Sequence, residues 1–461
     1  MLLKISQSLC LGFGLISSSA LFAAVKEYHL VIDESPINLT GKTVKRITIN
    51  GKFPAPLLEF EEGDDAVIHV QNNLNNQDTS LHWHGLLLPG LMDGVPGFNG
   101  FQGIKPKQSF TYRFKVRQNG TYWYHAHSKG QEQDGLYGAL VIRPKAQTLL
   151  PAHEQTERDY VVMLSDFHEQ GSQQIQNNLK KSAEYYQNQR ETLGDVLQQV
   201  KRDGLKATWS DRKMCMLKTD LSDVTGYTFL VNGKTPQQNW SGQFQPNEKV
   251  RLRFINASAM SFFDVRIPQL KMTVVSADGQ PVQPVNVDEF RIGTAETYDV
   301  IVEPTAAHYQ IEAESIDRSG FAIGSLHQAT DSSKAPAPVQ LPTPRPRALL
   351  TMEDMGHGEQ HDMSHDTHSS QTMQTATSEH DQHAQHDMHA SHNAMSGTNQ
   401  PHQPVEGWAN MSTPAGHKAL QYQDLKALTP QPDTRAAERE LVIRLGATMQ
   451  RYIWTMNGKT F

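Results

Sequence analysis

Hydrophobic and polar residues alternate with period two along much of the chain. The stretches FTYRFKV (residues 110–116) and VRLRFIN (residues 250–256) place an apolar side chain at every second position. Because alternate side chains of a strand share a face, this pattern predicts half-buried antiparallel strands. We therefore expect an all-β protein built from sandwiches or barrels. Residues 174–205 depart from the pattern, since they are rich in Gln, Lys, Leu and Glu without Pro, and they predict a helical insert.

A turn signal occurs three times, each time after a β-rich stretch. The three segments are ITINGKFP (residues 47–54), FLVNGKTP (229–236) and WTMNGKTF (454–461). Asn-Gly is typical of a tight turn between two strands. KEYHLVI at 26–32 also resembles ERELVIR at 438–444. These similarities predict an internal repeat, with a third copy that starts near the end of this sequence and whose remainder we expect to follow Phe461.

The first residues have the layout of a secretory signal. Lys4 precedes a short apolar stretch, and small residues stand at Ala23 and Ala24. The apolar stretch is shorter than the roughly 20 residues needed to span a bilayer. Removal of the signal would also remove Cys10 and leave Cys215 as the only cysteine, so no intrachain disulfide could form.

Composition changes divide the rest of the chain. The Pro-rich stretch KAPAPVQLPTPRP begins a long polar segment that has too few apolar residues to form a packed core. We predict a signal peptide at 1–23, a first domain at 25–146, a second at 155–333, a linker and Met/His-rich segment without ordered structure at 334–435, and the start of a third domain at 436–461. The formal net charge of −7 and the lack of a basic patch argue against a nucleic-acid partner.

Two His-x-His motifs carry the clearest chemistry. LHWHG contains His82 and His84, and WYHAH contains His125 and His127. On a strand, each pair points to one face and could hold a metal ion. Sites made only of imidazole suit copper or zinc. A single such pair can be a surface accident, but two pairs about forty residues apart in one predicted domain favour a metal site.

The sequence around these motifs resembles a known family. HWHGLLLPGLMDGVPG and GTYWYHAHSKGQEQDGLYGALVI are similar to the first cupredoxin domain of multicopper oxidases. SDRKM, TDLSDVTGYTFLVNGKTP and RLRFINAS extend the resemblance, which is closest to the bacterial copper-resistance protein A family. It implies tandem cupredoxin-like Greek-key β-barrel domains and copper as the cofactor.

The resemblance also implies roles for individual residues. His82 corresponds to a ligand of the type-2 copper, and His84, His125 and His127 correspond to ligands of the type-3 pair. Asp93, in MDGVPG, corresponds to an acidic residue that helps to deliver protons, although Asp-Gly is also a common turn. In such enzymes the copper cluster reduces O₂ to water without releasing partly reduced oxygen. Neutral imidazole is the ligand form, so activity should fall in acid.

This sequence departs from the family pattern in one respect. The family takes further cluster histidines and its blue type-1 copper site from a last domain that contains a His-Cys-His stretch, and no such stretch occurs here. Cys215 has Met and Lys neighbours and is either a spare thiol or, with Met214 and Met216, a transient Cu(I) ligand. We expect the 461-residue chain alone to show no blue absorption near roughly 600 nm, since that band requires a Cys/His site, and to be inactive as an oxidase.

The Met/His-rich segment is a second candidate copper site. Thioether sulfur favours Cu(I), and imidazole binds either copper state. We predict loose copper capture by the following residues: Met355, His357, His361, Met363, His365, His386, Met388 and His389. The alternative is a solvated linker with no ligand.

Two functions follow from these features. The first is a periplasmic multicopper oxidase of copper resistance that oxidises Cu(I) with O₂, with phenols as a further candidate substrate. The second is a periplasmic protein that sequesters copper through the Met/His-rich segment. A laccase specialised for phenols is disfavoured by that segment. We expect O₂ and Cu(I) as substrates, periplasmic copper-handling proteins as possible partners, and no membrane span.

Overall fold

The computed structural model describes residues 24–145, 148–181, 222–329, 339–345, 413–430, 434–447 and 454–460, together with a few residues between 185 and 206. Strands dominate these residues, as the alternating pattern predicts. The predicted signal peptide, Cys215 and the Met/His-rich segment lie outside the described residues.

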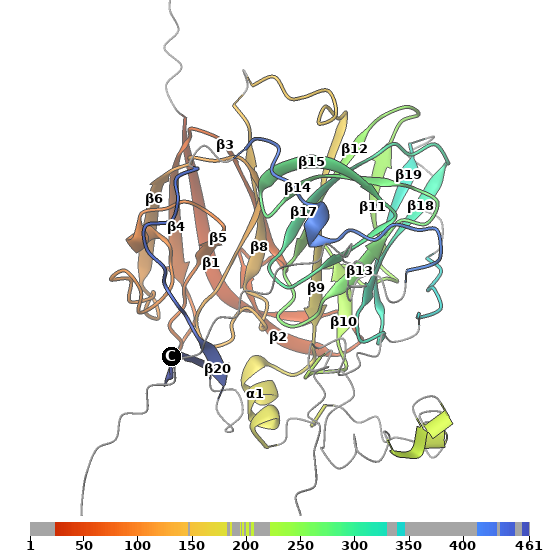
Figure 1. Cartoon of the computed structure of the whole chain (residues 1–461). Helices are drawn as coiled ribbons and strands as arrows, with labels where there is room; N and C mark the ends of the chain where they lie inside the picture. The colour runs from red at the N-terminus through yellow and green to blue at the C-terminus, as the bar shows by residue number, and fades with distance from the viewer. Residues whose placement is uncertain are drawn as a thin grey trace, which may run out of the picture.

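The first domain is a sandwich of two four-stranded sheets (Figure 1). Their facing sides share one apolar core, in which Trp83, Tyr112 and Leu140 are fully buried. The outer sheet has the order β2 (Thr43–Ile49), β1 (Val25–Asn38), β4 (Asp65–Asn72) and β6 (Ser109–Lys115). The inner sheet, next to the second domain, has the order β3 (Ala55–Glu61), β8 (Tyr137–Arg143), β7 (Gly120–His125) and β5 (His82–His84).

The second domain is also a two-sheet sandwich, with its own core around Phe254, Phe263 and Ile311. One sheet comprises β10 (Thr228–Val231), β9 (Arg158–Phe167), β12 (Val250–Asn256), β17 (Thr297–Val302), β14 (Met272–Ala277) and β15 (Gln280–Val287). The other comprises β11 (Trp240–Phe244), β19 (Phe321–Gln328), β18 (His308–Ser315), β13 (Phe263–Arg266) and β16 (Glu289–Ile292).

The strand pairing corrects one expectation, that the strands are antiparallel. The sheets are mixed, because β1 and β4, β3 and β8, β9 and β12, and β11 and β19 pair in parallel. In each described domain the strands form two facing sheets. The expected alternation holds in β6, where Tyr112 and Phe114 are buried and Arg113 is exposed. It fails in β12, whose seven residues are all buried.

The three Asn-Gly turns have the same backbone conformation, which confirms the predicted turn at all three positions. In each turn both Asn and Gly have positive φ, namely 52° and 70° at Asn50–Gly51, as a tight hairpin turn requires. The Asn side chain of each turn accepts a hydrogen bond from a backbone N–H of an earlier extended segment. These pairs are Val31 and Asn50, Met163 and Asn232, and Arg444 and Asn457, each 2.8 Å apart. The third turn joins β21 (Trp454–Met456) to β22 (Lys459–Thr460), and β21 also pairs with β20 (Leu445–Ala447).

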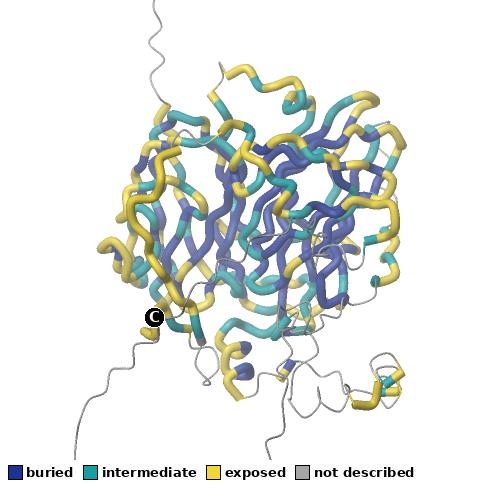
Figure 2. The backbone as a smooth tube through the Cα atoms, in the orientation of Figure 1, coloured by how far each residue is buried: buried dark blue, intermediate teal, exposed yellow. Residues whose placement is uncertain are grey.

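The inner sheet of the first domain packs directly on the second domain. Trp123 and Tyr137 of the first domain form an apolar cluster with Met163 and Ile255 of the second. Figure 2 shows the buried backbone continuing through the centre of the molecule, where β8, β9 and β12 lie. The sequence alone did not predict this contact between the two domains. The contact explains why β7 and β8 are buried on both faces.

Helical structure is limited in the described residues. It comprises α1 (Ser172–Lys181), two short 3₁₀ segments, η1 (Gly90–Met92) and η2 (Tyr422–Asp424), and a few helical residues between 194 and 206. α1 confirms the start of the predicted helical insert. Its first residue, Ser172, binds the carboxylate of Asp134 through both its backbone N–H and its hydroxyl, at 2.7 and 2.6 Å, so the helix links the two domains.

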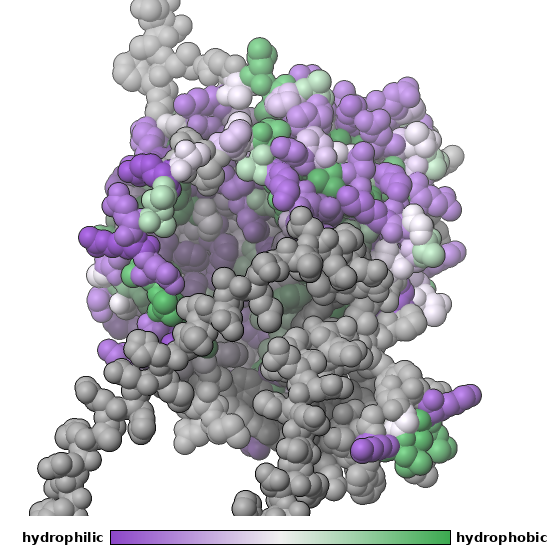
Figure 3. All heavy atoms as spheres, viewed as in Figure 1, coloured by the Kyte–Doolittle hydropathy of each residue, from purple (hydrophilic) through white to green (hydrophobic). Residues whose placement is uncertain are grey.

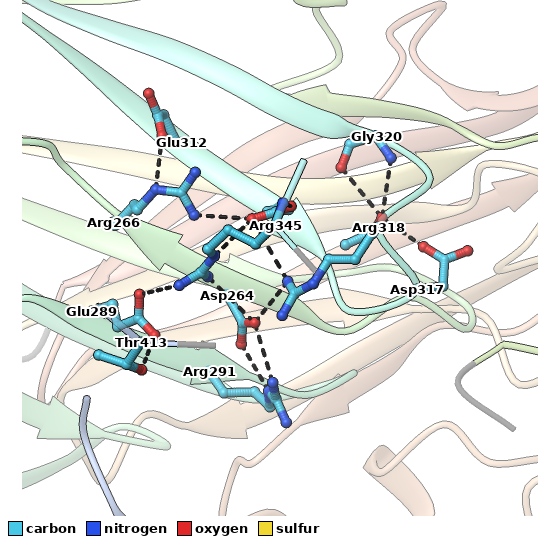
Figure 4. A network of polar contacts seen from close by, with 12 residues as sticks. Asp264, Arg266, Glu289, Arg291, Glu312, Asp317, Arg318, Gly320, Arg345 and Thr413 are labelled. Atoms are coloured by element: carbon cyan, nitrogen blue, oxygen red, sulfur yellow. Dashed lines mark hydrogen bonds and ion pairs between the residues drawn. The ribbon is translucent and has the colours of Figure 1, made fainter. Parts of the chain in front are cut away.

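A buried charge network closes one side of the second domain (Figure 4). Asp264 binds Arg291 and Arg318, and Glu314 binds Arg266 and Arg345. Glu289 accepts hydrogen bonds from Arg345 at 2.8 Å and from the Thr413 hydroxyl at 2.6 Å. The Glu289 carboxylate therefore binds both Arg345 and Thr413, which are the described residues on either side of positions 346–412.

The surface is mainly hydrophilic in the view of Figure 3, where apolar side chains occupy small, separate areas of the described residues. No helix among the described residues is long and apolar enough to cross a membrane.

Candidate metal centre

The four histidines of the two His-x-His motifs come together at one edge of the inner sheet. β5 is the edge strand and pairs antiparallel with β7, so that His82 lies opposite His125. Trp83, between the histidines of the first motif, points the other way into the core and packs against Tyr112 and Tyr124. The predicted alternation is therefore confirmed for the first motif. In the second motif β7 ends at His125, so His127 lies just beyond the strand and not on it as predicted.

The four imidazoles form a compact cluster. The ring centroids of His82 lie 5.6 Å from those of His84, 5.5 Å from those of His125 and 4.9 Å from those of His127. His84 Nδ1 is 3.3 Å from His125 Nε2. Ligand nitrogens of His82, His84 and His125 all lie within 4.8 Å of one another, which is close enough for one metal ion to contact them.

The environment favours the uncharged form of three of these imidazoles. Burial, followed by the repulsion from neighbouring histidines, lowers the pKa of His84 to about 4 and that of His127 to about 4. Burial also lowers the pKa of His82, and it outweighs the opposite effect of Asp93. Metal binding requires neutral imidazole, so the cluster holds His82, His84 and His127 in the form that binds metal.

Asp93 fixes the orientation of His82. The Asp93 carbonyl oxygen is 2.8 Å from His82 Nδ1, and the carboxylate oxygen Oδ1 is 3.4 Å from the same atom. Gly94 makes this approach possible, because its φ is +79° and a Cβ there would lie 1.7 Å from the carbonyl oxygen of Leu81. The Asp-Gly pair thus forms a turn, and that turn also places a carboxylate beside the cluster.

Two further residues orient His125 and were not predicted from the sequence. Glu132 Oε2 lies 2.6 Å from His125 Nδ1, which directs Nε2 of the same ring toward His84. Trp123 stacks on the His125 ring with centroids 4.0 Å apart. Trp123 shares the His-x-His alternation and could have been identified from it. Glu132 could not, since it reaches His125 only through the turn at 128–135.

Relatives of known function resemble this chain over most of its length. Residues 31–147 and 158–330 match two family models that are both described as multicopper oxidase. Copper resistance protein A of Escherichia coli is 43% identical over 94% of this chain and 77% of its own length. Copper resistance protein A of Pseudomonas syringae pv. tomato is 45% identical with the same coverage.

The chain belongs to the multicopper oxidase family. Its cofactor is copper. The imidazoles of the cluster suit that metal, and two of them, His82 and His125, contact carboxylates through Nδ1. The crystal structure of a laccase from Botrytis aclada is similar, with a TM-score of 0.53, 29% identity, and coverage of 70% of this chain and 56% of the laccase. The structure of Fet3p has the same fold, with a TM-score of 0.52 at 22% identity.

The resemblance to multicopper oxidases, the all-β fold and the copper cofactor are therefore confirmed. The predicted domain boundaries and the roles of individual residues stay predictions. No cysteine is present among the described residues, and the eight Met and His residues of the segment at 355–389 also lie outside them.

We expect Glu132 to strengthen copper binding at the cluster. Glu132→Ala removes the acceptor for His125 Nδ1 and should lower copper affinity by roughly 10- to 100-fold, as the loss of such an outer partner does in other metal sites. Glu132→Gln keeps an acceptor without the charge and should lose less. Copper titration against a chromophoric chelator measures both, and equal affinity in all three proteins would contradict this role.

We expect the cluster histidines to titrate in acid. An ordinary histidine, with a pKa near 6.5, is about nine-tenths protonated at pH 5.5, whereas a pKa of about 4 leaves His84 and His127 neutral there. Copper should thus remain bound at pH 5.5 and be lost as pH falls toward 4. NMR titration of the copper-free protein, assigned with His84→Gln and His127→Gln variants, checks this; midpoints near 6.5 would contradict it.

Proposed function

We propose that this protein is a copper-resistance oxidase that oxidises Cu(I) and reduces O₂ to water. The observation that supports it best is the cluster of four imidazoles at the edge of the inner sheet, in which burial lowers the pKa of His84 and His127 to about 4. Identities of 43–45% to proteins named Copper resistance protein A favour this substrate over phenols, because the laccase similarity is 29%.

In this proposal the histidines divide into the roles that the family resemblance implies. His82 would hold the type-2 copper, and His84, His125 and His127 would hold the type-3 pair. Copper bound there would supply the single-electron chemistry that the reduction of O₂ requires. The chain itself fixes the ring positions by strand pairing, orients His125 through Glu132, and keeps one face of His125 from water by the Trp123 ring.

Asp93 is the proposed proton donor. Reduction of one O₂ to two waters consumes four electrons and four protons, so four Cu(I) are oxidised per O₂. The Asp93 carboxylate is partly exposed and lies 3.4 Å from His82 Nδ1. It can take protons from solvent and release them beside the cluster. This role accords with its position, and the turn at Asp93–Gly94 supplies the geometry.

We place the protein in the periplasm, on the basis of the secretory layout of residues 1–23. Periplasmic copper-handling proteins are its proposed partners. The Met/His-rich segment would bind copper in addition. Sequestration of copper alone is the less favoured function, because it does not explain the presence of the four-histidine cluster.

Oxygen consumption tests the proposal. Copper-loaded, full-length protein should consume O₂ when Cu(I) is supplied, with four Cu(I) oxidised per O₂ and no peroxide accumulating. Addition of a tight Cu(I) chelator should stop the uptake. Uptake that occurs only with phenols would point to a laccase, and no uptake with either reductant would leave sequestration as the function.

A further inference from the structure

A second group of potential metal ligands lies on the solvent side of the first domain. Glu27 and His29 are two residues apart on β1, so they share the face opposite to the buried Leu30. β1 pairs in parallel with β4, and the register places His69 beside His29. The three side chains therefore meet on the outer sheet, whereas the cluster described above lies on the inner sheet.

The three side chains already converge on one point. Glu27 Oε1 is 3.2 Å from His29 Nε2 and 2.9 Å from His69 Nε2. The two rings are stacked, with centroids 4.6 Å apart and planes at 12°. One ligand atom from each residue lies within 4.8 Å of the other two. A metal ion could replace the contacts that the two nitrogens now make with the carboxylate.

The rest of the sheet orients one of the ligands. His69 Nδ1 is 2.9 Å from the Thr111 hydroxyl on β6, which is the residue opposite His69 in the sheet. Without metal, Nε2–H donates to Glu27 Oε1, and the Thr111 hydroxyl can donate to Nδ1. With a metal ion at Nε2, the proton moves to Nδ1 and the Thr111 oxygen accepts from it, so the same residue orients the ring for metal binding. Metal-bound histidines commonly have their other nitrogen fixed in this way.

We propose that Glu27, His29 and His69 form a surface binding site for Cu²⁺. Two imidazoles and one carboxylate are a donor set that Cu²⁺ accepts, and it binds more tightly than other divalent first-row metals to a given site. The exposed fractions of the His29 and Glu27 side chains, 71% and 52%, leave coordination positions open to water. Such a site would bind the ion reversibly at the protein surface.

Labelling of individual histidines tests the site directly. Full-length protein is treated with diethylpyrocarbonate at a series of increasing free Cu²⁺ concentrations. A glycine buffer sets each free Cu²⁺ concentration, so that copper binding at other sites does not change it. Mass spectrometry then maps the modified histidines. His29 and His69 should become protected together at one Cu²⁺ concentration. His153, which lies 3.9 Å from a single carboxylate, should require more Cu²⁺.

The carboxylate provides the matched control. Glu27→Gln should raise the Cu²⁺ concentration that protects the histidines at least about tenfold. Removal of a residue that only contacts a metal ligand already lowers metal affinity by about that factor or more. Glu34→Gln removes an exposed carboxylate from the same strand and should change nothing. Independent protection of the two histidines, no protection, or an unaltered response in Glu27→Gln would overturn the proposal. The measurement does not depend on oxidase activity, so it is separate from the test of the proposed function.

Discussion

The His84→Ala variant should lose Cu(I)-driven oxygen uptake by at least about 100-fold. His84 Nδ1 is 3.3 Å from His125 Nε2, so its removal takes one donor from the centre of the cluster. Loss of an outer partner of a metal ligand already costs roughly 10- to 100-fold, and loss of the ligand itself should cost more. An oxygen electrode on copper-loaded, full-length protein measures the rate.

Controls separate the loss of copper from the loss of fold. His84 has a lowered pKa and is held in the neutral form, so its replacement by Ala removes no charge and should leave far-UV circular dichroism unchanged. His308→Ala alters a partly buried histidine of β18 in the second domain and should retain full activity. Uptake at the original rate in His84→Ala would show that the proposed assignment of the cluster is wrong.

The part of the site that follows from strand geometry could be predicted from sequence. Period two requires His82 and His84 to share a face, and the same holds for His125 and the residue two positions before it, Trp123. The structure agrees in each case. Local sequence could also identify the Asn-Gly turns, because their backbone conformation depends on the two turn residues and needs no distant contact.

Contacts between distant segments could not be predicted. Arg251 and Arg253 alternate with apolar residues and resemble a solvent-facing row, yet they are 7% and 4% exposed, because the first domain covers them. Glu132 reaches His125 through a turn, and His69 reaches His29 through a parallel register. Periodicity defines the faces of one strand, but it does not define which strand or domain lies against them.

The largest expected effect on stability comes from Arg253. Its guanidinium donates two hydrogen bonds to Asp159, both 2.7 Å long, and one each to Asp299 and to the Thr121 hydroxyl of the first domain. Burial alone would raise the pKa of Asp159, but these contacts outweigh it and lower that pKa. Arg253→Ala would leave two carboxylates with fewer partners in a buried interface.

We therefore expect Arg253→Ala to lower the free energy of unfolding by about 3 kcal/mol, since removal of one partner from a buried ion pair costs roughly 3–5 kcal/mol and Arg251 still contacts Asp299. Urea unfolding followed by tryptophan fluorescence measures it. Arg158→Ala breaks a pair with Glu248 whose arginine is 38% exposed, and it should cost much less, because exposed ion pairs contribute little to stability. Equal costs for the two variants would mean that the Arg253 contacts contribute no more than a surface pair.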